Sequence, residues 1–242
     1  MISDFLPYLN GKEFSSGLPI DLSGLYKEVT RIDFLVHLCN QKRIIHVGCT
    51  DHISLIDEKI RNNQWLHKLL TDVSSECIGV DINEESINYV HKLGYHNVIY
   101  GDITVSKLPE ITSKNWDYLI MGEILEHVDN PVSFLKDIKN NYRESIDKIV
   151  ITVPNILSLF YYNKMRKGFE FINTDHRYWF SPYTILKVII QSGIIPTDIS
   201  YCNRMPLSKY HLALRKIHFE KKKYPFYYFQ TLAVTGKLKD NE

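Results

Sequence analysis

Five short apolar runs rich in β-branched residues alternate with segments of helical periodicity, and this alternation constrains the fold more than any other sequence feature. The runs occupy residues 43–48, 77–81, 97–102, 116–122 and 148–154. Buried strands that alternate with helices form right-handed βαβ units around a parallel sheet. The sequence therefore predicts an α/β fold of the Rossmann-like, doubly wound type, with helices on both faces of a mostly parallel seven-stranded sheet.

The remaining segments complete one predicted domain over residues 1–242. Further strands are expected near 195–202 and 226–238, and the predicted helices are Gln64–Val73, Glu84–Leu93, Pro131–Asn140, one over 181–193 and one that begins after Ser23 as its N-cap. Residues 1–22 are predicted to be a loose N-terminal lead-in. The segments 155–181 and 203–224 are predicted embellishments on the acceptor side, the second an insertion before the last strand.

Composition excludes several classes of protein. A net charge of +1 gives no general argument for a nucleic-acid partner, and the four widely spaced cysteines form no CxxC pair. A run of about 18 apolar residues, which a membrane span requires, does not occur, and the N-terminus has no basic region typical of a signal peptide. We expect a cytoplasmic protein without a membrane span.

Polar or small residues follow three of the predicted strands. Gly48 ends the first, Asp81 the second and Asp102 the third. In open parallel sheets, ligands bind beyond the carboxyl ends of the strands. Glycine allows close approach of the backbone, and a carboxylate can accept hydrogen bonds from ribose hydroxyls or from an adenine amino group. The three together predict a nucleoside site.

The stretch "MGEILEHVDNP", which follows the fourth strand, gathers Glu123, Glu126 and His127. On a helix that begins after Gly122, these positions share one face. Carboxylates with an imidazole suit a divalent cation, and an imidazole can also act as a general base near neutral pH. The alternative is an ordinary helix start whose carboxylates interact with the helix dipole.

In these motifs the sequence resembles class I S-adenosylmethionine-dependent methyltransferases. The resemblance covers residues 24–238 and rests on "IIHVGCTDH", "IGVDI", "YGDI", "MGEILEHVDNP", "IVITVPN" and "HRYWFSPYTILKVIIQSG". The "LEHV" and "VPN" motifs are similar to those of ubiquinone-biosynthesis, glycan and small-molecule O-methyltransferases. In the first loop, His46 stands where the family has an acid, Gly48 is kept, and Thr50 and His52 replace the later glycines. Asp51 or His67 is a candidate for the missing polar contact.

The resemblance implies S-adenosyl-L-methionine as cofactor. The residues expected to contact it are His46, Gly48, Cys49, Thr50, Asp81, Ile82, Asp102, Ile103 and Gly122. The catalytic candidates are His127, Glu123 and Glu126. Similarity to small-RNA 3′-terminal 2′-O-methyltransferases, which hold a divalent ion with a Glu-x-x-Glu-His motif and a later histidine, implies Mg²⁺ or Mn²⁺ bound by Glu123, Glu126, His127 and His176. Metal-dependent and metal-free versions both remain open.

The late half of the chain is expected to bind the methyl acceptor. Aromatic and basic residues alternate there, and the candidates are Tyr161, Arg166, His176, Lys209, His211 and Arg215. Such residues suit an anionic group such as a phosphate or a nucleotide-linked sugar. A lipid-soluble acceptor is a further option, although the aromatics of "FYY" and "YPFYYF" are more simply core residues.

The resemblance thus implies methyl transfer to an oxygen of a small polar acceptor, with a sugar or phosphorylated metabolite of surface-glycan biosynthesis as first choice. The alternatives are a metal-dependent RNA ribose 2′-O-methyltransferase and a non-catalytic nucleoside-binding module. A dinucleotide dehydrogenase is disfavoured because the GxGxxG fingerprint is absent. Nucleic acid is the less favoured partner because the basic patch is small and no additional RNA-binding domain follows.

Overall fold

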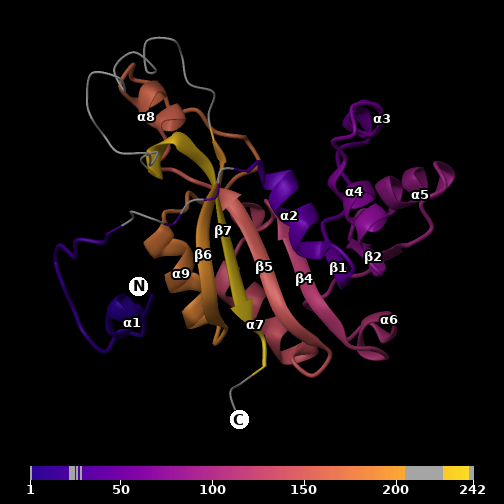
Figure 1. The fold of residues 1–242 in the computed structure, drawn as a ribbon, viewed down its shortest axis with the longest axis horizontal. Coiled ribbons are helices and arrows are strands. Elements are labelled where there is room, and N and C mark those ends of the chain that lie inside the picture. Colours follow the sequence, from indigo (N-terminus) through magenta and orange to yellow (C-terminus); the bar gives the residue numbers. More distant parts are fainter. Residues whose placement is uncertain (1, 22–24, 26, 28, 205–225, 240–242) are drawn as a thin grey trace.

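The structure is a computed structural model that describes residues 2–21, 25, 27, 29–204 and 226–239. Its centre is a seven-stranded sheet in the order β3-β2-β1-β4-β5-β7-β6 (Figure 1). The strands are β1 Arg43–Val47, β2 Glu76–Asp81, β3 Val98–Tyr100, β4 Trp116–Gly122, β5 Ile146–Pro154, β6 Ile195–Arg204 and β7 Phe229–Lys237. The first five are parallel, whereas β7 runs antiparallel to both β5 and β6. This confirms the predicted doubly wound sheet.

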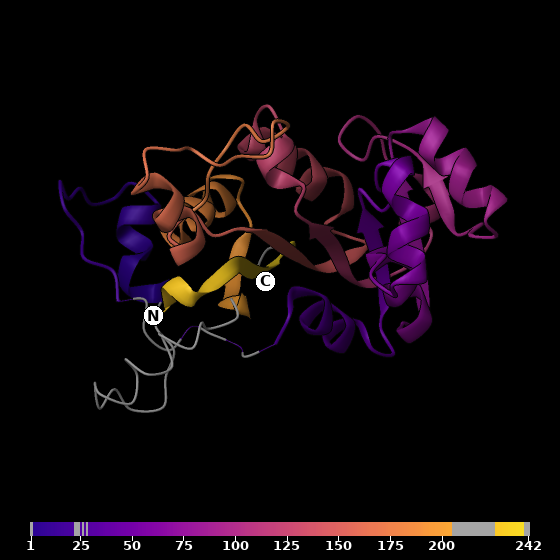
Figure 2. The same cartoon turned by 90° about the horizontal axis from the view of Figure 1, so that it is seen from above.

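Helices cover both faces of the sheet. The α-helices are α1 Ile2–Leu9, α2 Arg31–Cys39, α3 Ile53–Arg61, α4 Leu66–Val73, α5 Glu84–Lys92, α6 Pro109–Thr112, α7 Pro131–Tyr142, α8 Leu159–Met165 and α9 Pro182–Gln191. Two short 3₁₀ helices are η1 Leu125–His127 and η2 Phe226–Tyr228. Figure 2 shows α2 and α7 on opposite sides of the sheet. On one face α4 packs against α2, and on the other α9 packs against α7 and α1.

The alternation of side chains along the central strands divides the core between these faces. On β4, Leu119 and Met121 belong to the core beneath α7 and α9, whereas Ile120 belongs to the core beneath α2 and α4. All three are fully buried. Burial on both faces explains why these strands read as continuous apolar runs in the sequence.

Local signals set several helix starts. Asn83, Asn130 and Ser181 each accept a hydrogen bond from a backbone N–H in the first turn of the helix that follows. Ser181 and Thr184 form a complete capping box, and Pro131 and Pro182 occupy the first helical turn, where the missing N–H costs nothing. The predictions for α5, α7 and α9 are therefore confirmed to within about two residues at each end.

The N-terminal predictions need correction. Residues 2–9 form α1, which buries Leu9 and packs on α9, so the lead-in is not loose throughout. The next helix begins at Arg31, with Thr30 as its N-cap, and the proposed cap Ser23 lies outside the described residues. Leu25 and Lys27 instead exchange backbone hydrogen bonds with Tyr201 of β6. The hydrogen bonds to β6 therefore decide the conformation here, and the helical spacing of the apolar residues does not.

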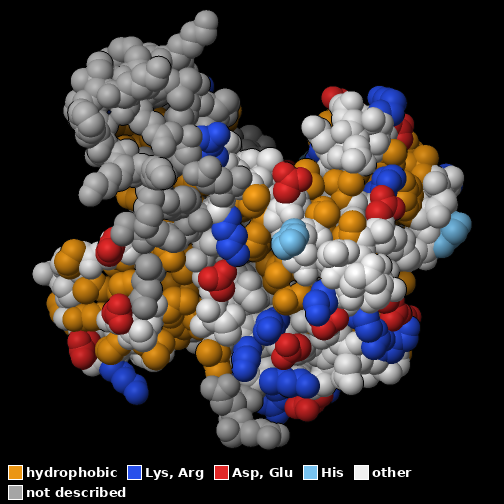
Figure 3. All heavy atoms as spheres, in the orientation of Figure 1, with side chains coloured by type: hydrophobic (Ala, Val, Ile, Leu, Met, Phe, Trp, Pro, Cys, Tyr) orange, Lys and Arg blue, Asp and Glu red, His pale blue; other side chains and the backbone are white. Residues whose placement is uncertain are grey.

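Most of the predicted insertion at 203–224 lies outside the described residues. Within the described chain, no helix combines the length and apolar character needed to cross a bilayer. Acidic and basic side chains are interspersed over the part of the surface seen at the lower right of Figure 3, in keeping with the net charge of +1. The four cysteines are buried free thiols.

Candidate functional site

A cavity of about 760 Å³ opens at the carboxyl ends of the parallel strands. Six of the nine residues predicted to contact the cofactor line it: Gly48, Thr50, Asp81, Ile82, Asp102 and Ile103. His127, Asp129, Asp175 and Arg177 line its opposite side. The cavity therefore joins the nucleoside end of the sheet to the segment that carries the catalytic candidates.

Asp81 is fixed at the end of β2 by its neighbours. Its Oδ2 accepts hydrogen bonds from the backbone N–H and the hydroxyl of Thr50, at 3.0 and 2.8 Å, and its Oδ1 accepts one from Asn83 N–H at 3.0 Å. Asp102 is fixed in the same way, because its Oδ1 accepts from the N–H and hydroxyl of Thr104 at 2.9 and 2.6 Å. Each carboxylate oxygen has two lone pairs, so both residues keep acceptor capacity toward the cavity.

An apolar surface completes this end of the cavity. Ile82 is 68% exposed, which is unusual for an isoleucine directly after a buried strand, and it lines the cavity together with Ile103. Apolar walls with a few convergent acceptors are typical of small-molecule sites. The residues present thus fit an adenosine group, with carboxylates for its polar atoms and aliphatic side chains for its ring.

Gly48 lies in the left-handed region, at φ +63°, where the chain leaves β1. A Cβ built on Gly48 would lie 2.2 Å from Cδ1 of Ile124. The glycine therefore lets the loop after β1 approach the loop that carries Ile124. This close approach gives a physical reason for a glycine at position 48.

Substitution of Gly48 by Ala is expected to lower the free energy of unfolding by about 1–3 kcal/mol, because strain at positive φ adds to the clash with Ile124. It should also weaken binding to the cavity. Urea denaturation of the variant measures the first effect. Because Ile124 packs on the core, a double-mutant cycle tests the clash: Gly48→Ala should cost less stability in the Ile124→Ala background than in the wild type, and an equal cost in both would contradict the clash.

Three predicted cofactor residues do not line the cavity. His46 and Cys49 are 3% and 2% exposed, and Gly122 lies against Arg31 and Leu66. His46 contacts His67 instead, with the two Nδ1 atoms 3.3 Å apart and the rings stacked. His46 thus does not take the place of the family's acid through its side chain, and His67 is not directed toward the cavity. Cys49 packs near Gly79 in the core.

Acidification should destabilise the protein through this buried pair. Burial lowers the pKa of His67 from 6.5 to about 4, and burial together with the charge of His67 holds the pKa of His46 well below its usual range. The unfolded chain therefore binds protons that the folded chain excludes. Stability is complete above pH 6.5 and should fall by about 3 kcal/mol for His67 alone as the pH approaches 4.

Chemical denaturation between pH 4 and 7 measures this loss. The variant His67→Gln should show a shallower fall in stability than the wild type over that range, whereas His96→Gln, which removes an exposed imidazole, should follow the wild type. Parallel curves for His67→Gln and the wild type would refute the assignment.

The stretch "GEILEH" forms a tight turn and not the expected α-helix. Glu123 has φ +61°, and only Leu125–His127 are helical, as the 3₁₀ helix η1. Glu123, Glu126 and His127 therefore do not share one helical face. Glu126 is fully buried, whereas His127 reaches the cavity. The short turn after β4 separates the two carboxylates that the sequence pattern had grouped.

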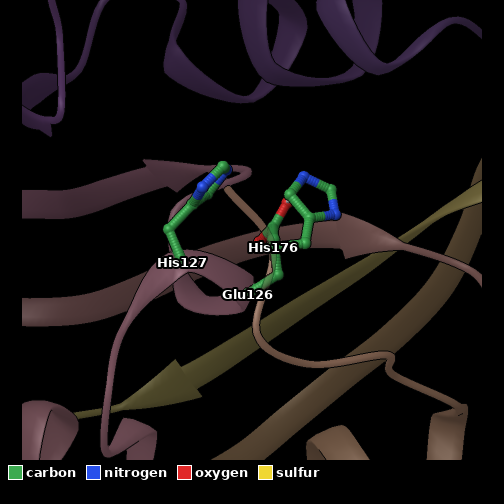
Figure 4. A group of neighbouring side chains, drawn as sticks. All are labelled: Glu126, His127 and His176. Carbon is green, nitrogen blue, oxygen red and sulfur yellow. The ribbon is translucent and has the colours of Figure 1, made fainter. Parts of the chain in front are cut away.

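His176 completes a cluster with two of these residues. Ligand atoms of Glu126, His127 and His176 all lie within 4.8 Å of one another. Figure 4 shows the carboxylate of Glu126 directed up toward His176, with the ring of His127 on the other side. The two rings meet edge to face with centroids 4.6 Å apart, and His176 Nε2 lies 4.0 Å from Glu126 Oε1. The predicted proximity of His176 is thus seen in the structure.

The segment after β5 holds this cluster in place. The N–H groups of Arg177 and Tyr178 donate to the carbonyl of Glu126 at 2.7 and 3.3 Å. The guanidinium of Arg177 donates to the carbonyl of His127 and pairs with Asp129 at 2.6 Å. Arg177 is not among the residues predicted from the sequence, although its place next to His176 in "DHRYW" is a signal for it.

The carboxyl group of Glu126 is buried without a hydrogen-bond partner on either oxygen among the described residues. Burial, with a contribution from the charge of Glu123, raises its pKa from 4.5 to about 8. His176 Nδ1 is likewise buried and without a partner in the described chain, and burial followed by the charge of His127 lowers the pKa of His176. Unsatisfied buried acceptors that converge in this way are costly unless a ligand satisfies them.

Glu123 is oriented by Arg31, whose Nε lies 3.4 Å from Glu123 Oε1. It is therefore set apart from the cluster of Glu126, His127 and His176. Two imidazoles and one carboxylate form a donor set richer in nitrogen than the mostly oxygen site expected from the sequence.

The acceptor-side candidates are only partly brought together. Tyr161 contacts Trp179 with ring centroids 4.6 Å apart, and Trp179 lies 6.1 Å from His176. Burial raises the pKa of Tyr161, and the nearby charges of Glu123 and Glu126 add to this effect. Arg166 lies at the exposed end of α8, away from the cluster's direct contacts, with its guanidinium 5.9 Å from the ring of Tyr162. Lys209, His211 and Arg215 lie outside the described residues.

Comparison with known proteins agrees with this architecture. Residues 62–144 match the family described as a methyltransferase domain. Among solved structures, an S-adenosylmethionine-dependent methyltransferase from Archaeoglobus fulgidus aligns with TM-score 0.52 and 19% identity, covering 85% of this chain and 90% of the other. Magnesium protoporphyrin IX methyltransferase from Synechocystis, solved with bound S-adenosylhomocysteine, aligns with TM-score 0.52 and 12% identity, covering 85% and 81%.

A small RNA methyltransferase aligns with TM-score 0.55 and 13% identity, covering 94% of this chain and 28% of that larger chain. At these identities the structural matches establish the fold. No curated protein matches the sequence.

The sheet and its helices form the Rossmann-like fold shared with class I S-adenosylmethionine-dependent methyltransferases. Together with the match over residues 62–144, this is the fold of a methyltransferase domain.

Proposed function

We propose that the protein transfers the methyl group of S-adenosylmethionine to a hydroxyl oxygen of a small polar acceptor, with His127 as the group that handles the proton. The observation that carries this proposal is the convergence of Glu126, His127 and His176 within 4.8 Å beside the cavity. An imidazole facing the cavity at this position is suited to a hydroxyl acceptor, because a hydroxyl must lose its proton as the new bond forms.

The nucleoside end of the cavity would hold the cofactor. Asp81 would accept hydrogen bonds from its ribose hydroxyls and Asp102 from its adenine amino group, while Ile82 packs on the ring. When bound, S-adenosylmethionine supplies an electrophilic methyl group on a sulfonium. The protein's contribution is then to align the acceptor oxygen with that methyl group and to exclude competing water, and proximity supplies most of the acceleration.

The cluster of Glu126, His127 and His176 also fits a divalent cation. The carboxylate of Glu126 has two oxygens without partners in the described chain. Burial disfavours its negative charge and so raises its pKa, and a bound cation would compensate that charge. Two imidazoles and one carboxylate favour Mn²⁺ over Mg²⁺, which prefers an all-oxygen set. An ion held there would lower the pKa of an acceptor hydroxyl. Glu123 pairs with Arg31, so it would have to leave Arg31 before it could bind the ion.

Polar residues at the mouth of the cavity favour a hydroxylated acceptor. Asp129, Asp175 and Arg177 line the cavity beside His127, and His52 lies 4.0 Å from Asp175. Carboxylates and a guanidinium at these positions can orient the hydroxyls of a sugar and can contact a phosphate. A sugar or phosphorylated metabolite of glycan biosynthesis is therefore the acceptor class that we propose.

Product analysis with S-adenosyl-[methyl-¹³C]methionine tests the proposal. Sugar phosphates, nucleotide-linked sugars and short oligoribonucleotides would be supplied in separate pools, with and without Mn²⁺. We expect an O-methyl carbon signal in a sugar pool, stronger when Mn²⁺ is present. An N-methyl product, or a signal confined to the oligoribonucleotides, would contradict the proposed acceptor. Equal activity in Mn²⁺ and in a chelator would contradict the metal.

A further inference from the structure

Helix α8 and the turn that follows it carry large apolar side chains that stay about half exposed or more. None of the residues of α8 is buried. Tyr162 and Met165 are 52% and 51% exposed, and Phe169 and Phe171 in the turn are 66% and 52% exposed. Large apolar side chains exposed together indicate a contact surface, because a single domain normally buries such residues. We call residues 157–172 the α8 surface.

Two apolar pockets flank this surface. Among the described residues, the lining of one pocket, of about 540 Å³, consists of apolar and aromatic side chains: Ile156, Leu157, Leu159, Tyr162, Met165, Phe226, Tyr227 and Tyr228. The other, of about 460 Å³, is bounded by Tyr161, Phe169, Phe171 and Trp179, and Glu170 is the one charged residue of its described lining. Ile156 and Met165 line both pockets, so the two are neighbours. Hydrocarbon chains or aromatic rings fit such walls better than hydrated groups do.

Basic residues accompany the apolar ones. Lys164, Arg166 and Lys167 lie within four positions, whereas Glu170 is the one acid of residues 157–172. Lys164 Nζ lies 4.8 Å from the centre of the Phe171 ring, and Arg166 lies over Tyr162. In a chain with a net charge of +1, this is a local excess of positive charge around an apolar patch.

We propose that the α8 surface docks on a lipid bilayer that contains anionic headgroups. Aromatic side chains prefer the boundary between headgroups and acyl chains, and lysine and arginine at the rim of the patch complement anionic lipids. Single-stranded RNA also binds basic and aromatic residues, but the aliphatic side chains of Leu157, Met165 and Ile172 and the apolar pockets favour acyl chains. Figure 1 shows α8 beyond the carboxyl ends of the strands, the edge at which the cavity lies. A bilayer docked there would face the acceptor side of the site.

Sedimentation with vesicles tests this proposal on the full chain and does not depend on catalysis. We expect the protein to bind vesicles of phosphatidylcholine with about 30% phosphatidylglycerol, and to bind pure phosphatidylcholine at least about tenfold more weakly. The variant Phe169→Ser/Phe171→Ser should reduce binding to the anionic vesicles by about tenfold or more. Phe14→Ser, which removes a phenylalanine that is 90% exposed elsewhere, is the matched control and should bind as the wild type does.

A second pair of variants tests the charge. Arg166→Gln/Lys167→Gln should weaken binding to anionic vesicles by about 30-fold, because each basic residue near such a surface contributes about 1 kcal/mol. Lys92→Gln/Lys107→Gln removes the same charge from exposed positions elsewhere and should have little effect. All four substitutions are at exposed sites, so circular dichroism should show unchanged folding.

Three results would overturn the proposal. The first is absence of binding to anionic vesicles, and the second is binding that the Phe169→Ser/Phe171→Ser variant retains in full. The third is a concentration-dependent oligomer, or binding of an oligoribonucleotide, that this variant abolishes while vesicle binding stays weak. That result would assign the α8 surface to another copy of the chain or to RNA.

Discussion

Replacing Glu126 by Gln should make the metal-free protein more stable at pH 8 and leave its stability nearly unchanged at pH 4.5. Burial raises the pKa of Glu126 in the folded protein from 4.5 to about 8. The folded chain therefore keeps a proton that the unfolded chain releases, and stability falls as the pH rises through this window. The full cost, which the Glu126→Gln variant avoids, is about 5 kcal/mol above pH 8.

Thermal unfolding of both proteins at several pH values between 4.5 and 8.5 measures this difference. Glu58→Gln, which removes an exposed carboxylate, is the control for loss of a negative charge. Addition of Mn²⁺ should raise the melting temperature of the wild type at pH 8 and not that of Glu126→Gln. A wild type that is the more stable protein at pH 8 without metal would show that the carboxyl group has a partner outside the described contacts.

Substitution of His127 by Ala should reduce methyl transfer by about 10³-fold while leaving the binding of S-adenosylhomocysteine within about twofold. His127 lines the cavity opposite Asp81 and belongs to the cluster with Glu126 and His176. Its removal would take away the proposed proton acceptor and one proposed metal ligand together. His96→Ala, which removes an exposed imidazole, should leave the rate unchanged.

Single-turnover assays separate the two roles proposed for His127. If it acts as a base, part of the lost rate should return as the pH rises and hydroxide replaces the imidazole. If its main role is to hold Mn²⁺, the variant should need a higher metal concentration and show no such recovery. A variant that retains the wild-type rate would remove His127 from the reaction.

The fold could be predicted from the sequence where local and tertiary signals agree. The runs at 43–48, 77–81 and 116–122 are buried on both faces, so their composition alone marks them as strands of a parallel sheet. The prediction failed where the apolar spacing had another cause. Leu25 belongs to an extended segment that bonds to β6, and the α8 surface carries apolar residues that do not build the core.

The candidate site could be predicted as a set of motifs but not as a geometry. Asp81 and Asp102 line the cavity because strand ends in a parallel sheet meet at one edge. Glu126 and His127 are adjacent in sequence, yet a 3₁₀ turn buries one and leaves the other at the cavity. The exclusion of His46 depends on its contact with His67 from α4, which sequence spacing does not reveal.

The most direct test of the account is calorimetric titration with S-adenosylhomocysteine of the wild type, Asp81→Asn and His127→Ala. Asp81 is held at the cavity by Thr50 and Asn83, and we assign it to the nucleoside. We expect one binding site in the wild type, affinity retained by His127→Ala, and at least about tenfold weaker binding by Asp81→Asn, because a hydrogen bond to a charged group contributes about 1.5–3 kcal/mol. Absence of binding to the wild type, or equal affinity for Asp81→Asn, would contradict the assignment of this cavity to the cofactor.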